Sequence, residues 1–161
     1  MGVFSRKNKN KDYKTRIIHD EGLPNFAHDQ VINIYLDDDN NRFVISEFFA
    51  KTPKELYIDY DRITNAEILS EKEIIEKNKT VLGRAAVGTL LLGPLGGIVG
   101  GMSGVGTKQK KKVSYYFIIN YKSTIDDEIK IIRLKVMDII PGIAKQLKDR
   151  IKVDTECQQY L

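Results

Sequence analysis

The sequence is poor in the residues that build covalent, metal-based or catalytic sites. Among 161 residues it has one cysteine, two histidines and no tryptophan. The lone Cys157 excludes an internal disulfide. No group of histidine, cysteine and acidic residues has the spacing of metal ligands, and no strand-turn-helix pattern presents a nucleophilic serine. We therefore expect no metal, no cofactor and no enzymatic activity.

Acidic residues that lie close together in the sequence are the remaining candidates for catalysis. One group contains Glu71 and Glu73, and the other spans Asp126 to Glu128. Both groups fall where the pattern predicts strand ends and turns, and carboxylates at such positions are ordinarily solvated. We expect neither group to form a site.

The start of the chain lacks an apolar stretch of the secretory kind. Residues 1–16 carry six basic residues and one acid, whereas the rest of the chain has 20 basic and 21 acidic residues. This pattern predicts a cytoplasmic protein with a solvated basic arm and a neutral body. The arm is suited to anionic lipid. No aromatic residue interrupts it between Arg6 and Asp12, which disfavours nucleic acid as a partner.

Most of the chain alternates apolar and polar residues with the period of a β-strand. We expect strands at 31–36, 42–46, 55–60, 63–69, 113–121 and 129–136, with the fourth continuing toward Ile75. Turn-forming residues lie at 37–41 and 122–128, so the strands on either side of each turn form a hairpin. Five to seven antiparallel strands would build a bent sheet, a small partial barrel or a sandwich.

The last element changes to the period of a helix. Its apolar residues recur every three or four positions, at Ile139, Ile140, Ile143, Ala144, Leu147 and Ile151. Asp138 is suited to cap this helix, and Pro141 would lie in the first turn, where its missing N–H costs little. We therefore expect a mainly β (α+β) fold in which one amphipathic C-terminal helix plugs an open end of the sheet.

The most unusual feature is a long uncharged segment spaced by glycines. Residues 85–107 contain no charge, and of these 23 residues 8 are glycine and 11 are apolar. On a helix the glycines would form two parallel rows, Gly93 with Gly97 and Gly101, and Gly96 with Gly100 and Gly104. Each glycine costs a helix interior about 1 kcal/mol. Such rows therefore favour close packing against another backbone.

Three interpretations of this segment are open. As one helix it would be about 35 Å long, enough for a bilayer core of about 30 Å. A single span, however, would separate residues 1–84 from 108–161 and leave neither half with a complete core. In the second interpretation, Gly93 and Pro94 form the turn of a helical hairpin that dips into a membrane, with arms near 81–92 and 95–105. In the third, the same hairpin packs on the sheet or on another copy of the chain.

The order of the elements resembles that of bacterial pleckstrin-homology-like (PH-like) domains, in which a bent antiparallel sheet ends in one C-terminal helix. The stretches KTVLGRAAVG (79–88) and LGPLGGIVGG (92–101) are similar to a glycine-zipper insertion found in such proteins from Gram-positive bacteria and their phages. The resemblance implies a basic tail and lead-in segment at 1–29, a PH-like domain at 30–153 with its glycine-rich hairpin at about 81–107, and a C-terminal tail at 154–161.

The resemblance also bears on lipid recognition. Lipid-binding PH domains hold inositol phosphates with basic residues in the first loop between strands. We expect that loop at Asp37–Asn41, where three carboxylates would repel a phosphate. The sequence therefore predicts a PH-like scaffold without phosphoinositide recognition by that route.

Taken together, these patterns predict a non-enzymatic interaction module that is peripheral at the inner face of the cell membrane. The residues expected in the membrane or in self-association are Gly93, Pro94, Gly96, Gly97, Gly100, Gly101 and Gly104. The residues expected to contact an anionic surface are Lys79, Arg84, Lys108, Lys110, Lys111 and Lys112. The alternative is a soluble homo-oligomer whose glycine faces pack between subunits, including a phage or prophage regulator that binds a host protein along a sheet edge.

Overall fold

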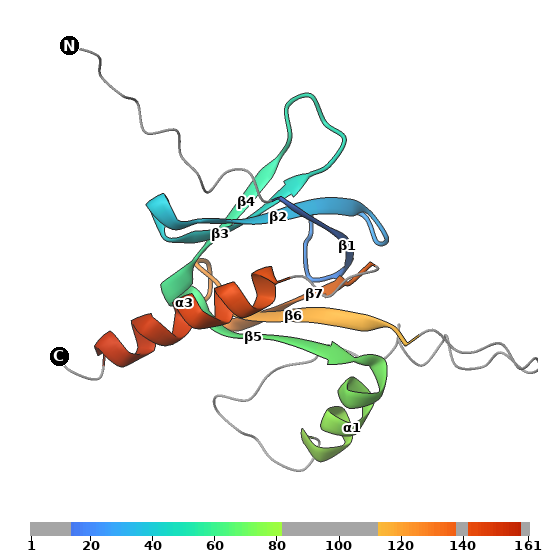
Figure 1. Cartoon of the computed structure of the whole chain (residues 1–161), viewed down its shortest axis with the longest axis vertical. Coiled ribbons are helices and arrows are strands. Elements are labelled where there is room, and N and C mark those ends of the chain that lie inside the picture. The colour runs from blue at the N-terminus through green and yellow to red at the C-terminus, as the bar shows by residue number, and fades with distance from the viewer. Residues whose placement is uncertain (1–13, 82–112, 138–141, 159–161) are drawn as a thin grey trace, which may run out of the picture.

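The protein is built from seven strands and two longer helices, as described by a computed structural model for residues 14–81, 113–137 and 142–158 (Figure 1). The strands are β1 (Thr15–Glu21), β2 (Val31–Asp37), β3 (Arg42–Glu47), β4 (Glu55–Asp59), β5 (Ile63–Ser70), β6 (Tyr115–Lys122) and β7 (Ile129–Lys135). The α-helices are α1 (Glu71–Val81) and α3 (Ile143–Gln158). Two short 3-10 helices, η2 (Asp38–Asn40) and η3 (Tyr60–Arg62), turn the chain after β2 and β4.

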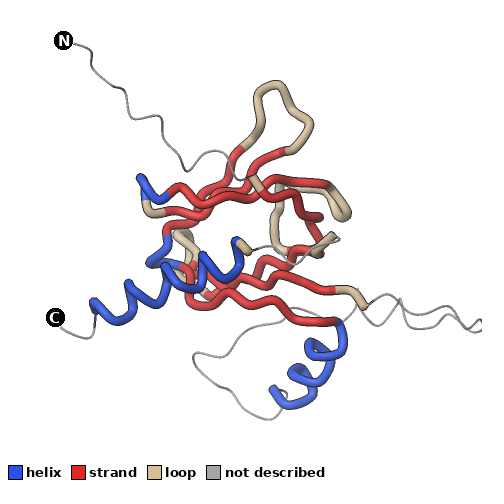
Figure 2. The backbone as a smooth tube through the Cα atoms, in the orientation of Figure 1, coloured by secondary structure: helices blue, strands red, loops and turns tan. Residues whose placement is uncertain are grey.

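All seven strands belong to one antiparallel sheet with the order β4-β3-β2-β1-β7-β6-β5. The sheet bends over, so that β1–β4 and β5–β7 face each other across the core (Figure 2). Strands β4 and β5 form its two edges. This arrangement confirms the predicted mainly β fold, a bent antiparallel sheet followed by one C-terminal helix.

The core lies between the two faces of the bent sheet and is closed by α3. Phe43 of β3 and Phe117 of β6 are both fully buried, and their rings meet edge to face with centroids 6.3 Å apart. From α3, Leu147 and Ile151 enter the same cluster, and the helix packs against β5 and η3. The four predicted apolar positions that the structure describes, Ile143, Ala144, Leu147 and Ile151, therefore lie in the core because they repeat with the period of the helix.

Strand β1 is the main element that the sequence prediction missed. It falls within the predicted lead-in segment, yet it lies between β2 and β7 in the middle of the sheet. Its sequence, TRIIHDE, has only two strongly apolar residues, Ile17 and Ile18. Its first two residues, Thr15 and Arg16, belong to the predicted solvated arm of residues 1–16, so the arm prediction is wrong at these two positions. Backbone pairing with β2 on one side and β7 on the other holds this strand in the sheet. Alternation of apolar and polar residues in its own sequence contributes little.

The position of β1 corrects the prediction about the first loop of the sheet. Because β1 precedes β2, the first loop between strands is 22–30, and Asp37–Asn41 forms the second, β2–β3 turn. In that second turn Asn41 has a left-handed φ of 52°, which agrees with the turn-forming residues found at 37–41. The argument from three carboxylates was therefore placed on the wrong loop. The true first loop contains no Lys or Arg.

Two further differences concern the helices. The predicted continuation of the fourth strand toward Ile75 is wrong, because β5 ends at Ser70 and α1 begins at Glu71. The C-terminal helix α3 starts at Ile143 and extends through Gln158, into the predicted tail. The proposed capping residue Asp138, the first-turn Pro141 and the apolar pair 139–140 lie outside the described residues.

Candidate functional site

The base of the glycine-rich insertion is one narrow place at the end of the β5–β6 pair. Strands β5 and β6 pair along most of their length, with one irregularity between Ile63 and Asn65, and Ser70 lies opposite Tyr115. One residue further out, the Glu71 N–H donates to the Ser114 carbonyl at 3.0 Å. The chain therefore departs toward the insertion and comes back from it at adjacent backbones. A single span that separates two independently folded halves is incompatible with this pairing.

The departing chain is turned away from the sheet by a capping box at the start of α1. The Ser70 hydroxyl donates to the Glu73 carboxylate at 2.6 Å, and the Ser70 N–H donates to the same oxygen at 2.7 Å. The Glu73 N–H donates back to the Ser70 hydroxyl at 3.3 Å. The hydroxyl and then the N–H of Ser70 lower the pKa of Glu73. The serine with a glutamate three residues later is a sequence signal for this helix start that the strand prediction overlooked.

Helix α1 packs on the outer face of the sheet beside this base. Ile74 is fully buried there and forms a second apolar cluster with Leu69, Tyr116 and Ile118. The two acids predicted to lie in a strand end, Glu71 and Glu73, are in the first turn of α1, where acids suit the helix dipole. Their role is structural, because they start a helix that fixes the direction in which the insertion leaves.

Exposed apolar side chains gather around the base of the insertion. Val113, Tyr115 and Met137 are 55%, 37% and 44% exposed. The Val136 N–H donates to the Tyr115 carbonyl at 2.8 Å, so the end of β7 lies beside the start of β6. The base thus carries an apolar rim that the sheet itself does not cover.

The residues predicted to make the membrane or subunit contact lie outside the described residues. This holds for Gly93, Pro94, Gly96, Gly97, Gly100, Gly101 and Gly104, and for Arg84, Lys108, Lys110, Lys111 and Lys112. The backbone of Lys79 lies in α1. For these residues the structure describes only the base of the insertion, where the chain leaves the sheet and returns to it.

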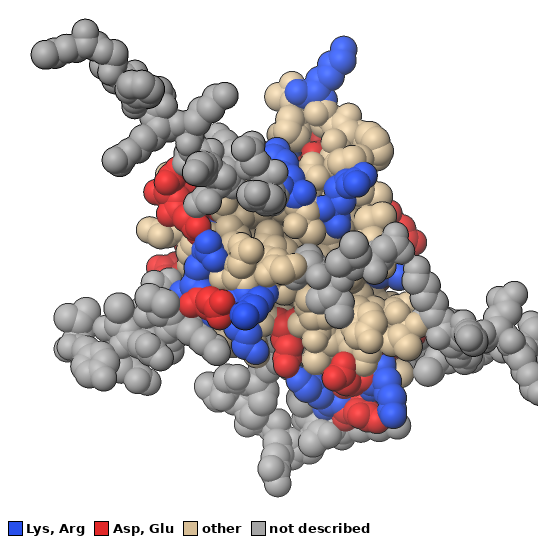
Figure 3. Space-filling model, viewed as in Figure 1, with Lys and Arg blue, Asp and Glu red and all other residues tan. Residues whose placement is uncertain are grey.

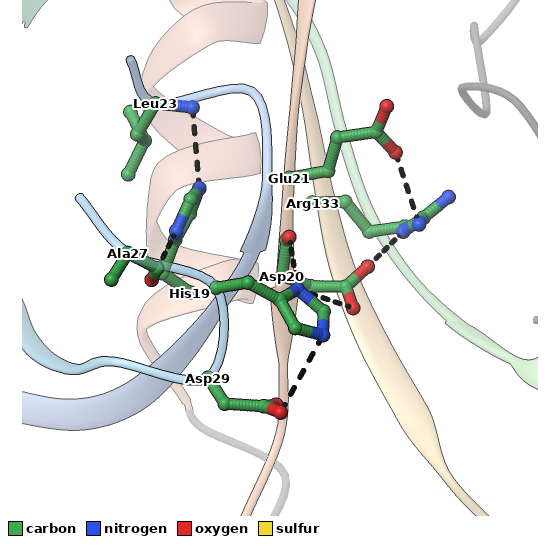
Figure 4. A network of polar contacts seen from close by, with 8 residues as sticks. His19, Asp20, Glu21, Leu23, Ala27, Asp29 and Arg133 are labelled. Atoms are coloured by element: carbon green, nitrogen blue, oxygen red, sulfur yellow. Dashed lines mark hydrogen bonds and ion pairs between the residues drawn. The ribbon is translucent and has the colours of Figure 1, made fainter. Parts of the chain in front are cut away.

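Next to the base, a buried arginine joins β1 to β7 (Figure 4). The side chain of Arg133 is only 4% exposed and forms ion pairs with Asp20 and, at 3.0 Å, with Glu21. Its guanidinium also lies 5.9 Å from the ring centroid of Tyr116, which packs with α1. A buried arginine needs such partners because an uncompensated charge in the interior is costly. This network ties the central strand to the sheet half that carries the insertion.

Two histidines make hydrogen bonds to the backbone at the first loop of the sheet, and one of them, His19, is labelled in Figure 4. Nδ1 of the buried His19 lies 2.9 Å from the Ala27 carbonyl, and its Nε2 accepts the Leu23 N–H at 3.2 Å. Both ring nitrogens are therefore used to fix the loop. His28 is exposed, and the Asp20 carbonyl, followed by the Asp29 carboxylate, raises its pKa. These contacts give both histidines a structural role.

A cavity of about 240 Å³ lies between the start of α3, the start of β1 and the end of β2. It is lined by Thr15, Leu36, Asp38, Gly142, Ile143, Gln146 and Arg150. Asp38 and Arg150 are bound to each other, and this lining holds no serine, cysteine or histidine that could act as a nucleophile or base. The cavity supports no catalytic assignment.

Within the described parts of the chain, no group of His, Cys, Asp and Glu is arranged to hold a metal ion. The acidic group Asp126–Glu128 lies in the β6–β7 turn, as predicted. There the side chains of Lys130 and Ser123 lower the pKa of Asp126 to about 2. None of the helices in 14–81, 113–137 and 142–158 is both long and apolar enough to cross a bilayer.

Comparison with known proteins agrees with the fold and the position of the insertion. Residues 23–137 match the family model described as "Glycine zipper containing PH domain". No curated protein and no solved structure matches this chain. Domains of the PH type are generally non-catalytic interaction modules. Since the match covers most of the sheet and the whole glycine-rich segment, the chain belongs to the family of glycine-zipper-containing PH domains.

Proposed function

We propose that this protein is an adaptor that attaches its PH domain to the inner membrane face through the glycine-zipper hairpin and the basic residues that flank it. The observation that supports this proposal is the pairing of Ser70 with Tyr115, which returns both ends of the insertion to one point. A segment tethered in this way can enter a bilayer and leave it again on the same side. The sheet then stays whole on that side.

The charges around the insertion fit an anionic surface. Lys79 and Arg84 precede the uncharged segment, and Lys108 and the run Lys110–Lys112 follow it. Because the backbones of Glu71 and Ser114 are adjacent, we expect both basic groups to gather at one end of the domain. Each lysine or arginine near an anionic leaflet contributes about 1 kcal/mol. The exposed rim of Val113, Tyr115 and Met137 adds an apolar border to the same end.

The test is flotation of the purified protein with lipid vesicles. We expect co-flotation with phosphatidylcholine vesicles that contain phosphatidylserine, and weaker binding when the salt concentration is raised. The double variant Lys110→Gln, Lys112→Gln should bind about tenfold or more weakly. The matched control is Lys145→Gln, Lys148→Gln on α3, which removes the same charge elsewhere and should bind like the unmodified protein. Equal loss in both variants, or no vesicle binding at all, would reject the proposal.

The second candidate is a soluble homo-oligomer whose glycine rows pack between subunits. The exposed rim at the base favours it, because a second copy could cover Val113, Tyr115 and Met137. Light scattering in detergent-free buffer should then give a multiple of the 18.4 kDa chain mass. Replacing Gly97 and Gly101 by leucine should return the mass to that of one chain. A monomer before the substitution would exclude this function.

A further inference from the structure

The loop between β3 and β4, residues 48–54, stands away from the sheet (Figure 1). It carries an exposed aromatic side chain. Phe49 is 86% exposed, which is unusual for a residue that gains so much from burial. The loop has a defined base, because the Glu47 N–H donates to the Lys54 carbonyl at 3.1 Å. Phe49 is therefore presented by a closed hairpin.

The neighbouring aromatic residue, Phe48, anchors the start of this loop. Phe48 is half-buried, and the guanidinium of Arg16 lies 5.6 Å from the centroid of its ring. The rings of Phe48 and Phe49 meet edge to face with centroids 4.4 Å apart. Arg16 thus holds Phe48 against β1, and Phe48 in turn contacts Phe49.

Two basic side chains of the loop are also exposed to solvent. Lys51 and Lys54 are both exposed, and the space-filling view shows basic side chains on the loop at the top of the molecule (Figure 3). The two acidic side chains at its base accept hydrogen bonds from other groups of the chain. Glu47 accepts the Lys54 N–H at 3.1 Å, and the two oxygens of Glu55 accept the hydroxyls of Tyr35 and Tyr57.

We propose that the β3–β4 loop is a second membrane contact, in which Phe49 enters the headgroup layer of an anionic bilayer and Lys51 and Lys54 lie at its surface. The proposal rests on the proposed membrane function but uses residues other than those of the glycine-rich insertion. A protruding tip reaches a flat surface without a steric barrier. An aromatic ring beside lysines matches the apolar interior and the negative surface of such a bilayer.

The absence of tryptophan from the chain makes a direct test possible. The variant Phe49→Trp introduces a single tryptophan at a site where 86% exposure leaves room for the larger ring. On addition of phosphatidylserine-containing vesicles, its fluorescence should shift to shorter wavelength and be quenched by brominated lipids. The blue shift requires the ring to leave water, and the quenching requires it to reach the boundary between the headgroups and the acyl chains.

The matched control is Ile125→Trp in the β6–β7 turn, where Ile125 is 94% exposed. This turn lies beside η3, because Arg62 donates to the Ser123 carbonyl at 2.6 Å, and η3 follows the far end of β4 from the loop. Tryptophan at position 125 should keep its emission wavelength when vesicles are added.

Charge reversal supplies a second measurement. The variant Lys51→Glu, Lys54→Glu should bind anionic vesicles about tenfold or more weakly, whereas Lys145→Glu, Lys148→Glu on α3 should have little effect. If the loop variant binds as the unmodified protein does, the proposed contact is wrong.

The outcomes separate this proposal from the proposed function. Binding to vesicles with a blue shift at position 49 and none at 125 supports the loop contact. Binding without a shift at position 49 rejects the loop contact and leaves the function of the insertion standing. Failure to bind vesicles rejects both. A blue shift that appears without lipid and grows with protein concentration would show that Phe49 packs against a second copy, which also rejects the membrane contact.

Discussion

Arg150 of α3 forms two parallel hydrogen bonds with Asp38 at the turn between β2 and β3. Its Nε and Nη2 donate to the two carboxylate oxygens, each at 2.5 Å. The hydroxyl of Tyr60 donates to the same carboxylate at 2.8 Å. Both charged side chains are about 30% exposed. This contact joins the C-terminal helix to the opposite half of the sheet.

Replacing Asp38 by asparagine should therefore lower the free energy of unfolding by about 1–2 kcal/mol, because it removes the negative charge and one of the two acceptor oxygens of this contact. The measurement is urea unfolding of Asp38→Asn, Arg150→Met and the double variant. We expect a coupling energy of about 1 kcal/mol between the two sites. Strictly additive effects of the single variants would contradict this account of the contact.

The same contact predicts a dependence on pH. The hydrogen bonds from Arg150, ahead of those from Tyr60, lower the pKa of Asp38 in the folded state. The folded state therefore favours the ionised form. Its contribution is complete above the ordinary aspartate pKa of about 3.9 and is lost as the pH falls through the lower folded value. The difference in urea midpoint between the unmodified protein and Asp38→Asn should be constant from about pH 5 to 7 and shrink in acid.

Gly22 occupies a position that should tolerate no side chain. It has a φ of 96°, and a Cβ atom there would lie 1.9 Å from the Ile131 carbonyl oxygen. We expect Gly22→Ala to cost at least about 2 kcal/mol of stability, from backbone strain and the shift of β7. Gly142→Ala is the control, since a Cβ atom there would meet nothing within 4 Å. Equal unfolding midpoints for the two variants would disagree with this assignment.

The capping box at Ser70 should control the helix that leads into the insertion. Replacing Ser70 by alanine removes the hydroxyl that links it to Glu73 and should cost about 1 kcal/mol. Amide hydrogen exchange should become faster in α1 and stay unchanged in β2 and β3. Ser70→Thr keeps the hydroxyl and should exchange much like the unmodified protein. Faster exchange spread evenly over the whole sheet would argue against a local cap.

Much of the fold was predictable because its strands and last helix carry clear periodic patterns. Five strands, from β2 to β7 with the exception of β5, match predicted ranges closely, and β5 was overextended at its end. The sequence of β1 carries little information, since Ile17 and Ile18 are adjacent and His19 is buried only because it binds the backbone of the next loop. Long-range pairing of this kind leaves no local pattern.

The sequence predicted the glycine-rich insertion of the candidate site, but not the contacts at the base of the insertion. The glycine spacing and the flanking lysines pointed to the insertion, and the family match confirms that the chain carries a glycine zipper in a PH domain. The link from Arg133 to Asp20 joins residues far apart in the sequence, and nothing near either residue indicates the other. Phe49 also went unnoticed, because its exposure depends on the loop that the pairing of β3 with β4 creates.

Excision of the insertion tests the central claim most directly. Replacing residues 82–112 by a glycine-serine linker reconnects Val81, at the end of α1, to residue 113 before β6. The linker must span the length of α1, about 16 Å, because the neighbouring backbones meet at Glu71, where α1 begins, and at Ser114. We predict a folded protein with one cooperative unfolding transition and at least tenfold weaker binding to phosphatidylserine-containing vesicles. A shortened protein that unfolds cooperatively and binds these vesicles as tightly as the full chain would contradict the claim that the glycine-zipper hairpin attaches this domain to the membrane.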